Sequence, residues 1–334
     1  MKKLMVIIAL LAIGFSPCIG NAETVLTFAN PDPPNSALVQ RFWVPWVERI
    51  NKASDGELRI EIKAGSVFST LLNSYDRVTS GAADMAWAMQ DLIRGKFPLT
   101  IVGSLPYEVN NAEDGSVAMW RLFKSGITAG EYSEIEPLGL FMFPQAGIHT
   151  KPPVNVAKGL DGLRIRSVGN ISGETVVRLG ASSVSIPLHE LYQSLSRGVV
   201  DGAITQWTGV GNFKLFEVTT HHVDSALGST NVMVCMNKKS LAKLSAKAKK
   251  ALLDNCGEKL SREFGAFLDN LNNEYREMVK NMKNQEIITL SASEAKIWKD
   301  KVIPINQEWA DNTPGGAKVL EAYRQEVKRI QQGK

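Results

Sequence analysis

Short apolar strands alternate with helical stretches in residues 159–210, and this alternation constrains the fold more than any other feature of the chain. Apolar runs predict strands, and the 3.6-residue periodicity between them predicts helices. The expected order is a strand at Leu163 and Ile165, a helix over 172–179, a strand over 183–186, a helix over 189–197 and a strand over 199–205. This order is typical of βαβ units in a parallel sheet, so we expect an α/β fold.

Polar residues stand where two of these strands end. Arg166 follows the first strand, and the last one ends on Thr205, Gln206 and Trp207. Ligands of open α/β sheets bind at the carboxyl ends of strands, so we expect these side chains to face one cleft. The guanidinium of Arg166 presents a rigid fork that binds a carboxylate through two hydrogen bonds, which favours an anchor for an organic acid. The alternative is a surface ion pair with an acid such as Asp161.

The residues before this segment predict the start of a doubly wound domain. A strand is expected over 24–29, a helix over 37–53 that Pro45 kinks or divides, and a strand over 57–63. Further strands are expected over 85–89 and 138–143. Trp87 and Gln90 fall at the end of the first of these two, which makes them candidates for the same cleft, although an indole is also a common core group.

The residues after it return to the first domain and then become helical. Strands over 221–226 and 231–236 precede a largely helical stretch over 241–283. Ser291 and Glu294 have the spacing of a capping box, and Pro314 with two glycines separates the following helix from a terminal one over 317–331. We expect domain I to comprise residues 23–148 and 233–290, domain II residues 149–232, and residues 291–334 to form helices that pack across both.

The N-terminal residues 1–22 have the layout of a secretory signal. Lys2 and Lys3 precede an apolar run over residues 4–15, and Ala22 offers a cleavage point. A membrane-spanning helix needs about 20 apolar residues, so a permanent anchor is the weaker interpretation. The residues before Cys18 lack the small-residue pattern of a lipoprotein. An exported, periplasmic protein is expected.

Charge and cysteine content narrow the class further. The whole chain has 38 basic and 34 acidic residues, and cleavage removes two lysines, which leaves 36 against 34. This near balance gives no support for nucleic-acid binding, which needs a concentrated basic stripe. Cys235 and Cys256 remain after cleavage, and the sequence leaves open whether they form a disulfide or stay two buried thiols.

Motifs of catalysis and metal binding are missing from the sequence. It has no Gly-x-Ser-x-Gly elbow, no Walker loop and no Gly-x-Gly-x-x-Gly. His221 and His222 would point to opposite faces of a strand, so one metal ion would not easily bind both. We therefore expect no cofactor, no metal and no enzymatic activity. A catalytic group assembled from scattered residues stays an alternative, because such groups are recognised in space.

The central segment also resembles a known family. GLDGLRIRS, the helix that follows it, and LYQSLSRGVVDGAITQW resemble the solute-receptor subunit of the tripartite ATP-independent periplasmic (TRAP) transporters. The resemblance continues through FANPDPPNS, VERINKASDGELRIEIKAGSVF, SGAADMAW and FKLFEVTTHHVD, and covers most of the chain. It implies a two-domain, type II-like periplasmic binding fold with hinge strands and long C-terminal helices.

The resemblance also implies roles for single residues. In such receptors the arginine at the position of Arg166 makes a salt bridge to the ligand carboxylate, and the segment at 205–207 often supplies a polar contact. His149 and Asn170 lie close to these motifs and are further candidates. Gln145 stands where sialic-acid-binding members have a second arginine, and Leu188 where they have a phenylalanine, so the resemblance favours a monocarboxylate over sialic acid.

These inferences together predict an exported receptor that captures a small organic acid by domain closure and delivers it to TRAP membrane subunits. Trp87, Phe141, Phe143 and Trp207 suggest a ligand with an apolar body. Two alternatives come from other classes. One is a secreted enzyme that uses Arg166 as a substrate anchor, and the other is a binding protein that signals through a sensory receptor.

Overall fold

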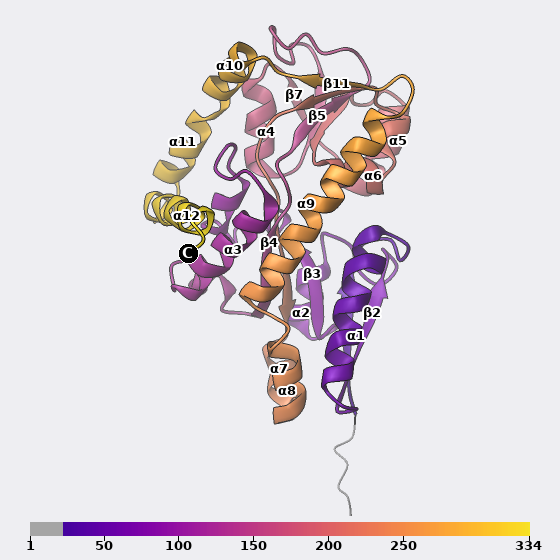
Figure 1. The fold of residues 1–334 in the computed structure, drawn as a ribbon, viewed down its shortest axis with the longest axis vertical. Coiled ribbons are helices and arrows are strands. Elements are labelled where there is room, and N and C mark those ends of the chain that lie inside the picture. The colour runs from indigo at the N-terminus through magenta and orange to yellow at the C-terminus, as the bar shows by residue number, and fades with distance from the viewer. Residues whose placement is uncertain (1–22) are drawn as a thin grey trace, which may run out of the picture.

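The computed structural model of the chain describes residues 23–334, which form two β-sheets surrounded by helices (Figure 1). The expected α/β fold class is thereby confirmed. The signal-peptide prediction for residues 1–22 lies outside the described residues. Within the described part, no helix has both the length and the apolar composition that crossing a membrane requires.

The first sheet has the strand order β2-β1-β3-β10-β4. Its strands are β1 (Thr24–Asn30), β2 (Leu58–Ala64), β3 (Met85–Met89), β4 (Glu136–Met142) and β10 (Asn231–Met236). β1 pairs in parallel with β2 and β3, whereas β10 runs antiparallel between β3 and β4. The carboxyl ends of β1, β2 and β3 therefore meet at one edge of this sheet, where their following loops lie together.

Side chains of this sheet alternate between two cores. On β3, Met85 and Trp87 belong to the core shared with α1 (Val44–Ala53), whereas Ala86 and Ala88 belong to the opposite one. The second core is closed by α2 (Ser74–Ser80) and α3 (Ala112–Lys124). A strand buried on both faces reads as a continuous apolar run, which is how β3 appears in the sequence.

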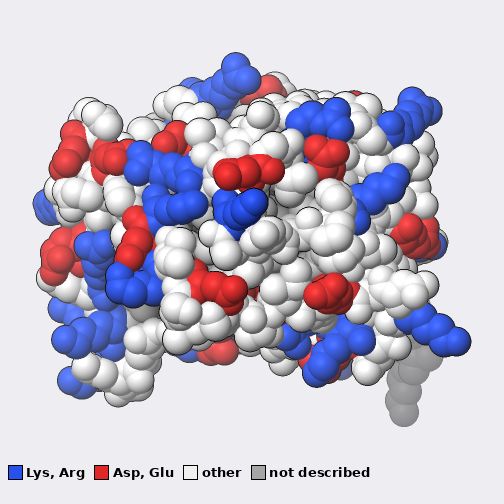
Figure 2. Space-filling model, turned by 90° about the horizontal axis from the view of Figure 1, so that it is seen from above, with Lys and Arg blue, Asp and Glu red and all other residues white. Residues whose placement is uncertain are grey.

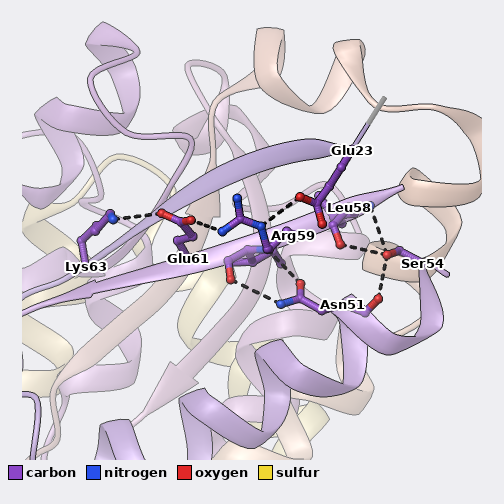
Figure 3. A network of polar contacts seen from close by, with 8 residues as sticks. Glu23, Asn51, Ser54, Leu58, Arg59, Glu61 and Lys63 are labelled. Carbon is purple, nitrogen blue, oxygen red and sulfur yellow. Dashed lines mark hydrogen bonds and ion pairs between the residues drawn. The ribbon is translucent and has the colours of Figure 1, made fainter. Parts of the chain in front are cut away.

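An edge strand of the first sheet is protected by charge (Figure 3). On β2, Arg59 forms ion pairs with Glu23 and Glu61, and Lys63 adds a further pair with Glu61 at 2.9 Å. Charged edge strands resist pairing with a second chain. Asn51 of α1 accepts a hydrogen bond from the β2 backbone at 2.8 Å, so the helix is held against the same strand.

The second sheet has the order β11-β9-β5-β8-β6-β7. Its strands are β5 (Gly147–Thr150), β6 (Arg164–Ser167), β7 (Ser182–Ser185), β8 (Gly202–Thr205), β9 (His221–Asp224) and β11 (Glu286–Thr289). β6 lies parallel to β7 and β8, as the alternation of strands and helices predicts. The helices between them are α4 (Gly169–Arg178), α5 (Leu191–Ser196) and α6 (Trp207–Asn212).

Sheet membership shifts the expected domain boundaries by two residues at β5 and at β10, and it differs over a whole strand at β11. Residues 286–290 were expected in domain I, but β11 pairs with β9 in the second sheet over residues 286–289. Local apolar character does not reveal which sheet a short strand joins, because that depends on where the preceding helix ends. Here α9 (Glu258–Lys280) contacts β4 near one end and α6 near the other, so it carries the chain from one sheet to the other (Figure 1).

The stretch expected to be largely helical contains three helices. They are α7 (Lys238–Lys243), α8 (Ala246–Leu253) and α9. Ser245 caps α8 by accepting the backbone N–H of Ala248, and Gly257 has a φ of 78°, which a residue with a side chain rarely adopts. Pro45 acts as predicted, because a π-turn over Val39–Trp43 gives way to α1 with this proline in its first turn.

The C-terminal helices connect both halves of the molecule. They are α10 (Ala292–Val302), α11 (Pro304–Asn312) and α12 (Gly316–Gln331). α10 and α11 contact α4 beside the second sheet, whereas α12 contacts α3 beside the first (Figure 1). They lie along the side of the molecule opposite to α1, away from the edge where β1, β2 and β3 end.

Removal of the cap of α10 is expected to weaken this connection. Ser291 accepts the backbone N–H of Glu294, and the Glu294 carboxylate accepts the backbone N–H of Ser291, so the predicted capping box is confirmed. Ser291→Ala should lower the free energy of unfolding by about 1 kcal/mol, because the backbone N–H of Glu294 loses its hydrogen-bond acceptor. Urea unfolding measures this loss, and Ser293→Ala in the same first turn should change it by less than half as much.

The two cysteines are free thiols on opposite sides of the first sheet. Cys235 on β10 is buried in the core with α3, whereas Cys256 packs against the core on the α1 side. Burial raises the pKa of both thiols. The sheet itself separates them, which resolves the question that the sequence left open in favour of two thiols.

Surface charge is mixed on the face seen from above in Figure 2. Basic and acidic side chains are interspersed there, and no broad area carries one sign. This view agrees with the near balance of basic and acidic residues in the sequence.

Candidate ligand-binding site

A cavity of about 520 Å³ lies between the two sheets. From the first sheet it is lined by the loops that follow β1 and β2 and by the end of β3. These residues are Pro31, Asp32, Pro33, Pro34, Leu38, Ala64, Gly65, Ser66, Val67, Thr70, Leu71, Trp87 and Met89. The volume is in the range of sites for small organic molecules.

The opposite wall comes from the second sheet and from the segments that cross between the sheets. Its residues are Phe143, Leu188, His189, Thr205, Gln206, Thr208, Gly209, Asn212, Phe213 and Thr230. The end of β8 and the start of α6 supply most of them. Both walls thus stand at carboxyl ends of strands, the location that the sequence predicts for a ligand.

Two aromatic rings form an apolar surface in this cavity. The Trp87 indole and the Phe143 ring stack with centroids 6.1 Å apart and an interplanar angle of 19°. The Trp87 Nε1–H donates a 2.7 Å hydrogen bond to Asp32 Oδ2, which fixes the indole. A flat apolar ligand would find a preformed surface here at little cost in side-chain entropy.

Arg166 lies at the base of the second wall. In the sheet it stands opposite Val184 of β7 and Ala203 of β8, and its Nε–H donates to the carbonyl oxygen of Ile186 at 2.9 Å. Both neighbouring segments continue into the cavity, one to Leu188 and the other to Thr205. Arg166 itself is not among the residues that line the cavity directly.

The guanidinium of Arg166 is buried without a counter-charge. The residue is 4% exposed, and it forms no ion pair with any acid in the described part of the chain. Its two Nη groups have no hydrogen-bond partner there, yet they are not sealed from solvent. Burial lowers the pKa of Arg166 to about 10, because desolvation disfavours the charged form. An anion that entered the cavity would remove this penalty.

Arg164, two residues earlier on the same strand, has a different environment. Its side chain is 48% exposed and forms a 2.8 Å ion pair with Asp201. The contrast explains why the two arginines of this strand have different chemistry. Arg164 is paired with an acid at the surface, whereas Arg166 carries a buried charge without a counter-ion.

Thr205 and Gln206 line the cavity as expected from their position at the end of β8. The Gln206 Nε2–H donates to Thr230 Oγ1 at 3.2 Å, across to the segment that returns to the first sheet. Trp87 also lines the cavity, as predicted from its place on β3. Direct contact of these side chains with a ligand stays a prediction.

Trp207 and His149 lie behind the cavity wall. Trp207 is 4% exposed and donates from Nε1 to Asp224 Oδ1 at 2.9 Å, with its ring edge-on to His149 at 4.7 Å. His149 Nε2 donates to the carbonyl oxygen of Thr205 at 3.1 Å, because a carbonyl only accepts, and Nδ1 lies 2.8 Å from Nδ1 of His222. Burial lowers the pKa of both histidines. They therefore support the end of β8 from within the core.

The remaining candidates have other partners. Gln90 donates to the Tyr132 hydroxyl at 2.8 Å in the core with α3, and Gln145 accepts from the backbone of Gly228 at 2.9 Å between the two crossing segments. Asn170 borders a separate hollow of about 330 Å³ between α4 and α11. None of the three lines the cavity between the sheets, because each side chain has its contacts elsewhere.

Several cavity residues were not singled out from the sequence. Asp32, the residues of the loop after β2 and Phe213 of the second wall are the main ones. A signal was available for Asp32, since FANPDPPNS follows a strand at the same sheet edge as Trp87. No group of three or more His, Cys, Asp or Glu side chains within the described residues is arranged to hold a metal ion.

Comparison with known proteins identifies the family of this fold. The model of the bacterial extracellular solute-binding protein family 7 (DctP) matches residues 28–312. The chain belongs to this family. The resemblance to TRAP receptors in the sequence is therefore confirmed, and the protein is a solute-binding protein.

Solved structures of TRAP solute-binding proteins show the same architecture. A TRAP solute-binding protein from Rhodoferax ferrireducens T118 in complex with copurified benzoate is 25% identical, with a TM-score of 0.87 and coverage of 92% of this chain and 99% of that chain. A marine metagenome TRAP solute-binding protein specific for aromatic acid ligands, in complex with 3-hydroxybenzoate, is 26% identical, with a TM-score of 0.86 and the same coverage. The two-domain fold expected for the chain is thereby confirmed.

A third solved structure extends this series. It is a TRAP periplasmic solute-binding protein from Bordetella bronchiseptica with bound (R)-mandelate and (S)-mandelate. It is 25% identical, with a TM-score of 0.82, and the match again covers 92% of this chain and 99% of that chain. All three of these relatives bind a small aromatic carboxylate.

Proposed function

We propose that this solute-binding protein captures a small aromatic monocarboxylate for a TRAP transporter. The observation that carries the proposal is the buried, unpaired guanidinium of Arg166 beside a cavity with a stacked Trp87–Phe143 surface. A carboxylate paired with Arg166 would satisfy its free Nη groups and form charge-assisted hydrogen bonds. The aromatic acids bound by the three relatives are consistent with this ligand class.

Capture rather than chemistry is proposed for the cavity. The ionisable side chains that line it are Asp32 and His189, and within the described residues no lining hydroxyl forms a hydrogen bond to either of them. A hydrolytic enzyme would need a nucleophile with a base in such reach. Closure of the two domains around the ligand would exclude water from the ion pair between Arg166 and the ligand carboxylate, and the bound ligand would stabilise the closed form.

Thermal unfolding of the purified protein with a panel of acids tests the ligand class. Benzoate, 3-hydroxybenzoate and mandelate represent aromatic monocarboxylates, whereas butyrate and succinate represent aliphatic acids. An acid at a hundredfold excess over its dissociation constant should stabilise the protein by about 2.7 kcal/mol. We expect the largest shift in midpoint from an aromatic acid, and recovery of that acid unchanged. Shifts from succinate alone, or from no acid, would overturn the proposal.

Delivery and location form the remaining part of the proposal. We propose that the chain is exported after cleavage behind Ala22 and that its closed form docks on TRAP membrane subunits, as its family membership suggests. Glu23 would then be the first residue of the mature protein, placed beside Arg59 on β2. N-terminal sequencing of the protein recovered from the periplasm checks the cleavage site, and a mature chain that still contains Lys2 would contradict it.

A further inference from the structure

Asp32 lines the cavity from the first wall. Its backbone N–H donates to the Asn30 side chain at 2.9 Å, and its Oδ2 accepts the Trp87 Nε1–H at 2.7 Å, so the carboxyl group has a fixed orientation. The other oxygen, Oδ1, has no hydrogen-bond partner among the described residues, although Asp32 lines the cavity. One acceptor of a well-held carboxyl group is therefore left for a ligand.

The charges around Asp32 make this acceptor unusual. No lysine or arginine of the described chain forms an ion pair with it, and it is the only carboxyl group that lines the cavity. The other ionisable lining residue is His189, on the opposite wall with a side chain that is 68% exposed. The cation Arg166 also stands on the side of the second sheet. The cavity thus has a positive charge behind its wall on one side and a carboxyl group in its lining on the other.

We infer that Asp32 selects the ligand by accepting a hydrogen bond from a hydroxyl or amino group that the acid carries away from its carboxylate. The inference rests on the proposed function, because Arg166 must hold the carboxylate for the far end to reach the first wall. The same oxygen disfavours an acid that carries a second carboxylate there, since two like charges would share a dry site. Asp32 is thus a specificity-determining residue rather than an anchor.

The protonation of Asp32 is consistent with this role. Burial raises its pKa to about 6, and the hydrogen bond from Trp87 opposes part of that shift. The group is therefore mostly ionised at pH 7.5 and mostly protonated at pH 5. A ligand without a hydrogen-bond donor would displace water from the ionised oxygen and leave that oxygen without a hydrogen bond. A ligand with a donor replaces the lost hydrogen bond.

A matched series of meta-substituted benzoates tests the inference by titration calorimetry. The series consists of benzoate, 3-hydroxybenzoate, 3-methoxybenzoate and isophthalate. Its members differ only in the meta substituent, which the inference places opposite Asp32. In the wild type at pH 7.5 we expect 3-hydroxybenzoate to bind at least tenfold more tightly than 3-methoxybenzoate and isophthalate. Asp32→Asn keeps an oxygen for Trp87 but removes the charge, so its preference for 3-hydroxybenzoate over isophthalate should shrink at least tenfold. Asp254→Asn, at an exposed pair with Lys250, is the matched control and should leave the order unchanged.

A pH comparison gives a second test that needs no change at Asp32. Between pH 7.5 and pH 5 the wild type should lose most of its discrimination against isophthalate, because the Asp32 carboxyl group becomes protonated. His189→Gln, which removes the other ionisable side chain that lines the cavity, should show the same loss. If Asp32→Asn does not fold, this pH comparison of the wild type still tests the role of Asp32.

The outcomes separate the two proposals. If the series binds in the same order to the wild type and Asp32→Asn, and that order does not change with pH, Asp32 is not a selector, although the proposed function stands. If no benzoate binds the wild type at all, the proposed function is overturned and the selection by Asp32 with it.

Discussion

Replacement of Arg166 by methionine should abolish high-affinity binding of carboxylates while leaving the protein as stable as the wild type or more stable. Truncation of one partner of a buried, hydrogen-bonded charge pair costs roughly 2–5 kcal/mol, which weakens binding by about 30-fold to several thousandfold. The unliganded protein loses only the bond to Ile186 and is freed of a buried charge. The lowering of the Arg166 pKa to about 10 means that burial of the charged guanidinium costs the folded protein on the order of 3 kcal/mol. Calorimetric titration and urea unfolding measure the two effects separately.

Arg164→Met is the matched control for this change. It removes the same guanidinium two residues away on β6, where the side chain is paired with Asp201 at the surface. Exposed pairs contribute about 0–1 kcal/mol, so a small loss of stability and an unchanged affinity are expected. Equal affinity of the Arg166 variant and the wild type would show that the carboxylate is anchored elsewhere.

Replacement of Phe264 by alanine should lower the free energy of unfolding by about 3–5 kcal/mol. Phe264 on α9 is fully buried, with its ring centroid 4.7 Å from those of Trp43 and Phe141 and 4.6 Å from that of Phe42. Loss of the ring leaves a cavity in a core that joins α1, β4 and α9. Urea unfolding followed by tryptophan fluorescence measures the change directly, since Trp43 reports on the same core.

Phe267→Ala on the same helix tests whether burial determines this effect. Phe267 stacks on Phe264 at 6.1 Å, but it is only partly buried, with Arg41 over its ring. We expect less than half of the destabilisation, because the neighbouring side chains and water fill the space that it leaves. A loss as large as that for Phe264 would mean that the helix position matters more than the buried area.

Local patterns predicted most of the elements correctly. The alternation in residues 159–210 became β6, α4, β7, α5 and β8 in parallel register, and the capping box at Ser291 formed as expected. These elements follow from side-chain periodicity and from caps within a few residues. The stretch after residue 238 was harder, because its apolar face continues through the breaks at Ser245 and Gly257.

The cavity was only partly visible in the sequence. Trp87, Thr205 and Gln206 were found because each stands at the end of a strand, whereas Gln90 satisfies the same rule and yet lies elsewhere, as does Asn170, which the resemblance alone suggested. Position along a strand indicates which end a residue occupies, but the direction of its side chain depends on the sheet and its neighbours. Asp32 lies in a loop, where no periodicity indicates orientation.

Local periodicity and short motifs were sufficient for the α/β class, most of the strands and helices, the family and the choice of Arg166. Other features depend on the tertiary fold: Arg166 is unpaired while Arg164 is neutralised, Trp207 and His149 stand behind the wall, and Asp32 lines the cavity. The physical reason is that burial and charge pairing arise from groups far apart in the chain. Asp201 reaches Arg164 across 37 positions and Trp87 reaches Asp32 across 55, distances over which no local pattern carries information.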